Sequence, residues 1–152
     1  MKCIKHYFLT ICFSIAVLSC TKLNNSTDVE SSLSESALAD LVGVEWIADS
    51  LMFPEGSYIP EAHKPITLEF TDDGRVGGKA ICNGYNGVYE TGESGDISID
   101  LLRWTEIACH PPLVDVFYFE LLEVMTYYER MDNKLYLQDT DSLNSIFFTA
   151  AE

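Results

Sequence analysis

Residues 66–82 read ITLEFTDDGRVGGKAIC, and this stretch decides the fold class. Its first five residues alternate apolar and polar side chains, which is typical of a strand with one buried face. The Asp73-Gly74 pair that follows favours a tight hairpin turn, because both residues tolerate positive φ values. Residues 75–82 then return as a second strand. The stretch therefore predicts an antiparallel β-hairpin.

Further strands are predicted on both sides of this hairpin, separated by residues that favour turns. The expected strands are residues 44–52, 87–91, 96–99, 103–108, 134–138 and 145–149. Residues 54–64, which contain two prolines, are expected to form a long connection, and residues 36–42 a short helix. The pattern predicts a mostly antiparallel β domain.

One longer helix is predicted after the Pro111-Pro112 pair. Apolar residues recur there at positions 117, 121, 124 and 128, which places them on one face of an α-helix over residues 113–128. We expect that face to pack against the sheet.

The N-terminus is typical of an export signal. Residues 1–6 are basic, and residues 7–19 form an uncharged, mainly apolar run that is too short to cross a bilayer as a helix. The run ends in Val-Leu-Ser-Cys, which resembles a lipobox, so we expect cleavage before Cys20 and acylation of that cysteine. An ordinary secretory signal is the alternative. Thr21, rather than Asp, follows the cysteine and favours the outer membrane over the inner one.

The mature chain is then expected to have two parts. Residues 20–40, rich in Ser, Asn and Thr, are predicted to be a flexible tether, and residues 41–152 the folded domain. Removing the two signal-peptide lysines changes the net charge from −15 to −17. Such an acidic chain repels phosphate backbones, so we expect no nucleic-acid partner. The membrane is expected to be contacted through the N-terminal lipid.

Two cysteines, Cys82 and Cys109, remain for the folded domain. In an oxidising compartment we expect them to form a disulfide, which by chain entropy stabilises the fold by about 3–4 kcal/mol. Two free thiols or a metal site are the alternatives. A thiolate zinc site normally needs four ligands, and His63 and His110 lie at no recognisable spacing for one. We therefore expect no metal and no cofactor.

No arrangement of residues indicates catalysis. The sequence lacks a glycine-rich phosphate loop and the G-x-S-x-G motif of a nucleophilic serine. Cys109 and His110 are adjacent, and neighbouring side chains rarely point at each other. The prediction is a protein that is not an enzyme.

Two motifs resemble those of the META domain family, also called HslJ-like. They are CNGYNGVY at residues 82–89 and WTEIAC at residues 104–109. The residues that match the family pattern are Asn83, Tyr85, Gly87 and Thr105, beside the two cysteines. Structural roles are expected for Asn83, in bonding backbone groups, and for Thr105, in a strand. The chain departs from the pattern where Ile81 replaces a common glycine and where Asp115 lies next to the place of a common glutamate.

The resemblance implies one α+β domain, a curled, half-barrel-like antiparallel sheet packed with one main helix. It also implies an envelope protein with a role in envelope integrity or stress tolerance. The leading hypothesis is a lipid-anchored, non-enzymatic protein that binds an envelope protein or an apolar ligand. A pilotin-like module for lipid or peptide is a sharper version, and an envelope hydrolase or an inhibitor of a secreted enzyme is the competing class.

Overall fold

The hairpin predicted at residues 66–82 forms in the computed structural model, which describes residues 41–108 and 113–152. Its second strand ends at Lys79, so residues 80–82, predicted to continue the strand, belong to the turn that follows. Strand β3 (Thr67–Phe70) pairs antiparallel with β4 (Arg75–Lys79), with Leu68 opposite Gly78. Leu68 and Phe70 are fully buried, whereas Glu69 between them is exposed. The alternation in the sequence therefore corresponds to the two faces of the strand.

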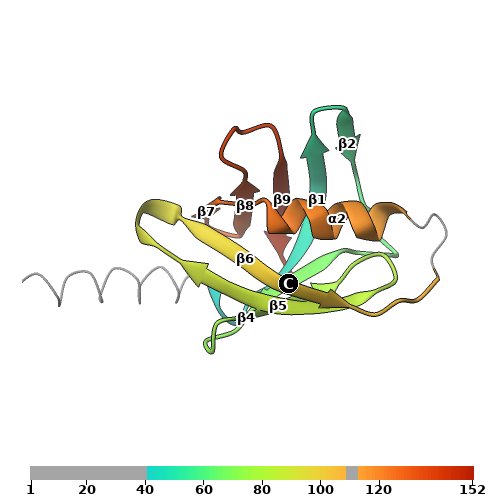
Figure 1. Cartoon of the computed structure of the whole chain (residues 1–152), viewed down its shortest axis with the longest axis horizontal. Helices are drawn as coiled ribbons and strands as arrows, with labels where there is room; N and C mark the ends of the chain where they lie inside the picture. The colour runs from blue at the N-terminus through green and yellow to red at the C-terminus, as the bar shows by residue number, and fades with distance from the viewer. Residues whose placement is uncertain (1–40, 109–112) are drawn as a thin grey trace, which may run out of the picture.

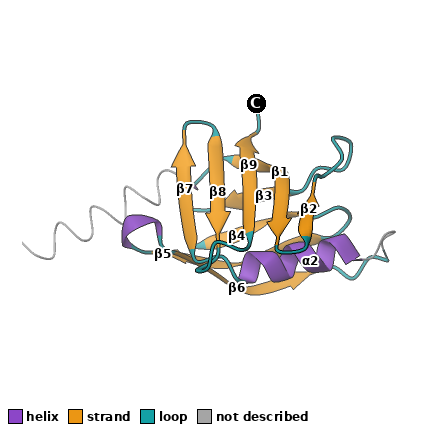
Figure 2. Cartoon of the chain, turned by 90° about the horizontal axis from the view of Figure 1, so that it is seen from above, coloured by secondary structure: helices purple, strands orange, loops and turns teal. Residues whose placement is uncertain are grey.

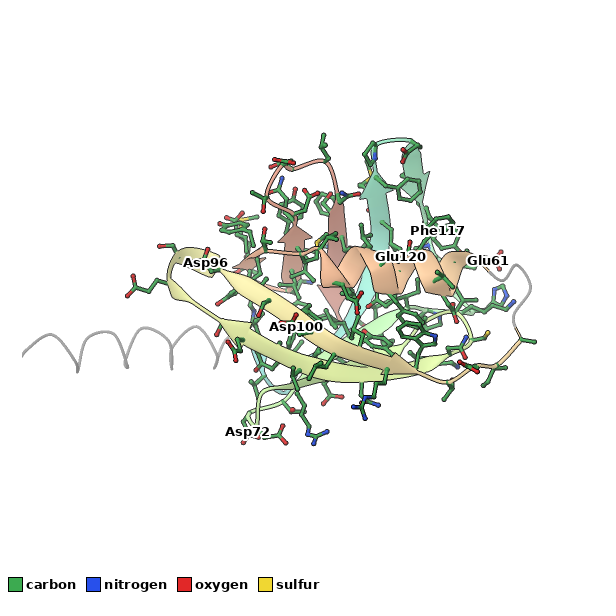
Figure 3. The ribbon with its side chains drawn as sticks, viewed as in Figure 1. Glu61, Asp72, Asp96, Asp100, Phe117 and Glu120 are labelled. Atoms are coloured by element: carbon green, nitrogen blue, oxygen red, sulfur yellow. The ribbon has the colours of Figure 1, made fainter. Side chains whose placement is uncertain are left out.

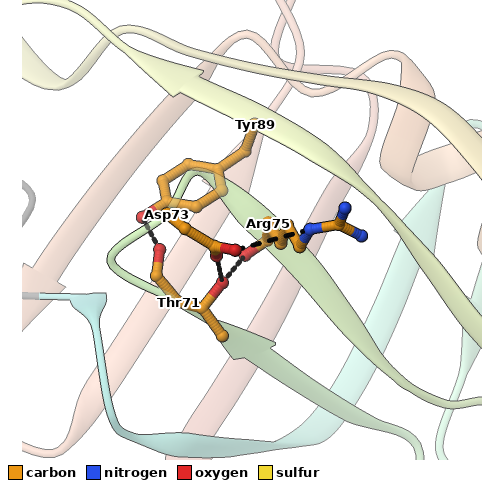
Figure 4. A network of polar contacts seen from close by, with 4 residues as sticks. All are labelled: Thr71, Asp73, Arg75 and Tyr89. Carbon is orange, nitrogen blue, oxygen red and sulfur yellow. Dashed lines mark hydrogen bonds and ion pairs between the residues drawn. The ribbon is translucent and has the colours of Figure 1, made fainter.

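The turn of this hairpin is held by its own polar groups (Figure 4). The hydroxyl of Thr71 donates to the carboxylate of Asp73, and Gly74 has a φ of 77°. The bond from Thr71 holds the pKa of Asp73 below its ordinary value. Tyr89 from the neighbouring strand donates its hydroxyl to the carbonyl of Thr71 over 3.0 Å, which fixes the turn to the sheet.

The described residues form one antiparallel sheet and one α-helix (Figure 1). The remaining elements are β1 (Glu45–Phe53), β2 (Gly56–Tyr58), β5 (Gly84–Thr91), η1 (Glu93–Gly95), β6 (Ile97–Trp104), α2 (Leu113–Glu123), β7 (Tyr127–Met131), β8 (Lys134–Gln138) and β9 (Ser145–Ala150). The strand order is β6-β5-β4-β3-β1-β9-β8-β7, and β2 pairs with β1 alone. The α+β class and the half-barrel expected from the family resemblance are confirmed.

The sheet curls until its two outer strands touch at one end. In Figure 2 the neighbouring strands β7, β8, β9 and β1 lie at a steep angle to β5 and β6. Asp96 forms an isolated antiparallel bridge with Tyr127, and the amide of Ile97 donates to the carbonyl of Thr126 over 3.1 Å. Away from this contact, α2 packs along β6. The curl thus encloses a core on one face of the sheet.

The core draws residues from both halves of the chain. Trp46 on β1, Phe148 on β9 and Tyr118 on α2 are all completely buried. Leu135 and Leu137 on β8 are also buried, as their alternation predicts. Since burial of one large apolar side chain contributes about 1.5–3 kcal/mol, this shared core links the start and the end of the domain energetically.

The helix differs from its prediction in length and in orientation. It ends at Glu123, and residues from Tyr127 onward form β7, because their backbone pairs antiparallel with β8. Of the four residues predicted to face the sheet, Leu121 and Tyr128 are buried, whereas Phe117 and Val124 are 56% and 46% exposed. Eight of the eleven residues of α2 are aliphatic or aromatic, so the helical period alone did not identify the buried face.

Other boundaries also differ from the predictions. The strands expected at residues 96–99 and 103–108 are one strand, β6, which ends at Trp104 and leaves Thr105 outside it. The expected connection at residues 54–64 contains the short strand β2. The short helix expected at residues 36–42 lies almost wholly outside the described residues, as do the predicted signal and tether.

Gly87, one of the family-motif residues, lies on β5 in close contact with β6. The pairing register of the two strands shifts between Asn86 and Val88. A Cβ atom at Gly87 would lie 2.7 Å from the carbonyl oxygen of Asp100 and 2.8 Å from a methyl group of Leu102. The irregular pairing therefore requires a residue without a side chain.

We predict that Gly87→Ala lowers the free energy of unfolding by about 1–3 kcal/mol, since the added methyl group overpacks the site. Urea denaturation followed by circular dichroism measures this. Gly84→Ala is the matched control on the same strand, because its Cβ would meet no atom closer than 3.9 Å. Equal stability of the two variants would contradict the proposed role of Gly87.

Candidate functional site

The family-motif residues meet at a buried carboxylate. Asp115 lies in the first turn of α2 and is 3% exposed. Its oxygens accept hydrogen bonds from the backbone amides of Ile81 and Asn83, each over 2.9 Å, and from that of Cys82 over 3.3 Å. Asp115 thereby fixes the turn between β4 and β5 to the start of the helix.

Asn83 extends this contact to a third segment. Its side-chain amide donates to Asp115 over 2.8 Å. Its side-chain oxygen accepts from the hydroxyl of Thr105 over 2.9 Å and from the amide of Ile107 over 2.8 Å. We call Asn83, Thr105, Ile107 and Asp115 the Asn83–Asp115 network. It joins the β4–β5 turn, the chain after β6 and the helix.

Tyr85, another motif residue, is buried beneath this network. Its hydroxyl lies 2.8 Å from the carbonyl of Thr67 and 2.7 Å from the hydroxyl of Tyr118. Burial raises the pKa of both tyrosines, so both hydroxyl groups keep their protons and continue to bridge β5, β3 and α2. The motif residues Asn83, Tyr85 and Thr105 therefore bond to the domain itself.

The accessible site lies on the opposite face of α2. A groove of about 520 Å³ runs between the helix and the β1–β2 hairpin. Figure 3 labels Phe117 and Glu120 on the helix beside this hairpin. The apolar side chains that line the groove are Leu51, Phe53, Pro54, Phe117, Leu121 and Val124. We call this site the apolar groove.

Its polar rim is acidic. Glu55 from the hairpin and Glu120 from the helix are the charged lining residues, and Asn144 completes the rim. Asn144 also donates its side-chain amide to Asp139 over 2.6 Å. Burial would raise the pKa of Asp139, but this bond and the amides of Leu143 and Asn144 outweigh it and lower the pKa. The loop beside the groove therefore carries a stable negative charge.

The sequence analysis did not find the apolar groove. The lining residues come from β1, α2 and the chain before β9, which are far apart in sequence. The available signal was an α2 in which large apolar residues occur on all sides and not on one face only. Such a helix is either buried on every side or exposes one apolar face at the surface, where a partner can cover it.

A family model for the META domain matches residues 39–152, about three quarters of the chain. The chain belongs to the META domain family. The resemblance carried by the two cysteine-containing motifs is thereby confirmed. No curated protein matches the chain.

Solved structures have a fold similar to that of this chain at low sequence identity. An NMR structure of a protein from Burkholderia xenovorans has a TM-score of 0.62 and 21% identity, and the match covers 76% of this chain and 87% of the other. A crystal structure of a DUF4847 family protein from Bacteroides vulgatus has a TM-score of 0.58 and 15% identity, with 74% and 96% covered. At identities this low, the structural matches establish a shared fold alone.

Two of the predicted sites in this META protein depend on residues outside the described ranges. Cys20 and Cys109 lie there, so the lipid attachment and the Cys82–Cys109 disulfide stay predictions. Asn83 holds the chain at Ile107, two residues before Cys109, against the turn that carries Cys82. None of the helices in the described part is both long and apolar enough to span a bilayer.

We predict that Asp115→Asn lowers the free energy of unfolding of the META domain by about 2–3 kcal/mol, because charge-assisted hydrogen bonds to buried amides are lost. Urea denaturation measures the change. Glu123→Gln, an exposed neutralisation on the same helix, is the control and is expected to cost less than about 0.5 kcal/mol. If both variants unfold at the wild-type urea concentration, the Asn83–Asp115 network does not stabilise the fold.

Proposed function

We propose that this chain is a lipid-anchored envelope protein whose META domain acts by binding a partner and not by catalysis. Anchoring through Cys20 is supported by the basic, apolar and Ser-Cys order of residues 1–20. The Thr at position 21 favours the outer membrane. Envelope integrity or stress tolerance is the role that the family resemblance implies for such binding.

The apolar groove is the observation that carries the binding proposal. Phe117 and Val124 each expose about half of their surface to water at its edge, while Leu51 and Leu121 form a buried floor. Apolar groups gathered in an open groove and rimmed by polar residues are typical of binding sites. A partner that covers them gains about 25 cal/mol for each Å² of apolar surface buried.

The buried polar side chains support the same reading. Asn83 and Asp115 bond to the backbone of two segments, the β4–β5 turn and the chain after β6, and Tyr85 bonds to Thr67 and Tyr118. Groups that act in catalysis must offer their atoms to a substrate, whereas these atoms hold the fold together. The hydrogen bonds of the family-motif side chains therefore stabilise the fold.

The anchoring part of the proposal predicts that cells expressing the full chain incorporate labelled palmitate into it and that the labelled protein fractionates with membranes. Cys20→Ser should abolish the label, because acylation requires that thiol. Cys12→Ser is the control and should remain labelled, since Cys12 leaves with the signal. Label that survives Cys20→Ser would contradict this site of anchoring.

The binding part predicts that the uncharged fluorescent probe N-phenyl-1-naphthylamine binds to residues 21–152 in detergent-free buffer. Phe117→Ala should weaken this binding at least about fivefold, because the exposed ring supplies a wall of the groove. Val116→Ala is the matched control, as Val116 is 43% exposed on the same helix but does not line the groove. Equal loss in both variants, or no binding by the wild type, would overturn the groove as a binding site.

A further inference from the structure

The acidic rim of the apolar groove restricts what can occupy it. Glu55 and Glu120 approach the groove from the hairpin and from the helix, on its two sides. An apolar ligand that enters must place its flanking groups beside these two carboxylates. A ligand with a positive charge there gains energy, and one with a negative charge is repelled.

No basic residue in the elements around the groove offsets these carboxylates. Helix α2 contains Asp115, Glu120 and Glu123 but neither Lys nor Arg. The hairpin tip at residues 53–58 and the loop at residues 139–144 likewise contain only acidic charges. The chain as a whole carries a net charge of −15, so the wider field has the same sign.

The dimensions of the groove suit a short polypeptide segment. Phe117 and Leu121 line the groove one turn of α2 apart, about 6 Å, and Val124 lines it just after the end of the helix. Two to three residues of an extended chain, at about 3.3 Å each, cover this distance. One or two large apolar side chains can therefore fill the groove while the residues on either side reach Glu55 and Glu120.

We propose that the apolar groove receives a cationic peptide segment of a partner protein, in which one or two large apolar side chains are flanked by Lys or Arg. This inference rests on the proposed binding function and names the chemistry of the partner. A fatty acid or an anionic lipid would place its own negative group against the rim. A second copy of the chain would bring an equally acidic surface.

The test compares three peptides with the same central Leu-Trp pair, flanked by Lys, by Gln or by Glu, binding to residues 21–152. Displacement of the uncharged fluorescent probe reports their affinities. The Lys peptide should bind about tenfold more tightly than the Gln peptide at low ionic strength, and the Glu peptide most weakly. Raising the salt concentration to about 0.5 M should remove most of the difference, because both rim carboxylates are exposed.

A double variant distinguishes the effect of the rim carboxylates on peptide affinity from the effect of the net charge of the chain. Glu55→Gln with Glu120→Gln should bring the Lys peptide to the affinity of the Gln peptide and leave the Gln peptide unchanged. Glu69→Gln with Glu90→Gln is the matched control, which changes the net charge equally at exposed positions that do not line the groove. This control should keep most of the tenfold preference.

Each contrary outcome identifies a different error. If the probe binds but the three peptides bind equally, the charge inference is wrong and the proposed binding function stands. If laurate displaces the probe and no peptide does, the occupant is an acyl chain. If sedimentation shows dimers that Phe117→Ala dissociates, the occupant is a second copy. If the probe itself does not bind, the proposed binding function fails as well.

Discussion

The carboxylate of Asp115 is the constraint on which the rest of the domain depends. It accepts hydrogen bonds from backbone amides in the turn between β4 and β5. These bonds attach the turn to the first turn of α2. Asn83 then connects the same point to the chain that follows β6. Because a buried, unsatisfied amide costs about 1–3 kcal/mol, these bonds stabilise the arrangement of the three segments. The position of α2, and with it the wall of the apolar groove, follows from this contact.

The sheet could be predicted from the sequence because its pattern is local. In β3 and β8 the apolar residues alternate, and Leu68, Leu135 and Leu137 were placed on the buried face correctly. The curl came from the family resemblance, because closure between Asp96 and Tyr127 joins segments that no local pattern connects. Gly87 was recognised as a motif residue, but its reason, the close approach of Asp100, exists only in the folded sheet.

The helix shows why the candidate site could not be predicted. A period of 3.6 residues identifies a buried face only when the other face is polar. In α2 the predicted face through Phe117 and Leu121 and the face through Tyr118 and Leu122 are both apolar, and the structure buries Tyr118 and Leu122 completely. On the predicted face Leu121 is buried, whereas Phe117 is exposed in the apolar groove. The apolar groove was therefore indicated in the sequence only by an α2 that contains more apolar residues than the core can bury.

The place of β1 in the sheet has a consequence for how the domain forms. This first strand lies between β3 and the last strand, β9, with Trp46 opposite Ala150, and the amide of Ala151 donates to the carbonyl of Glu45 over 2.8 Å. A chain that emerges from its N-terminus presents β1 long before β9 is available. Its central pairing is then one of the last to form, and folding dominated by such distant pairs is slow. The sheet can therefore close around its core only after the residues of β9 have joined β1.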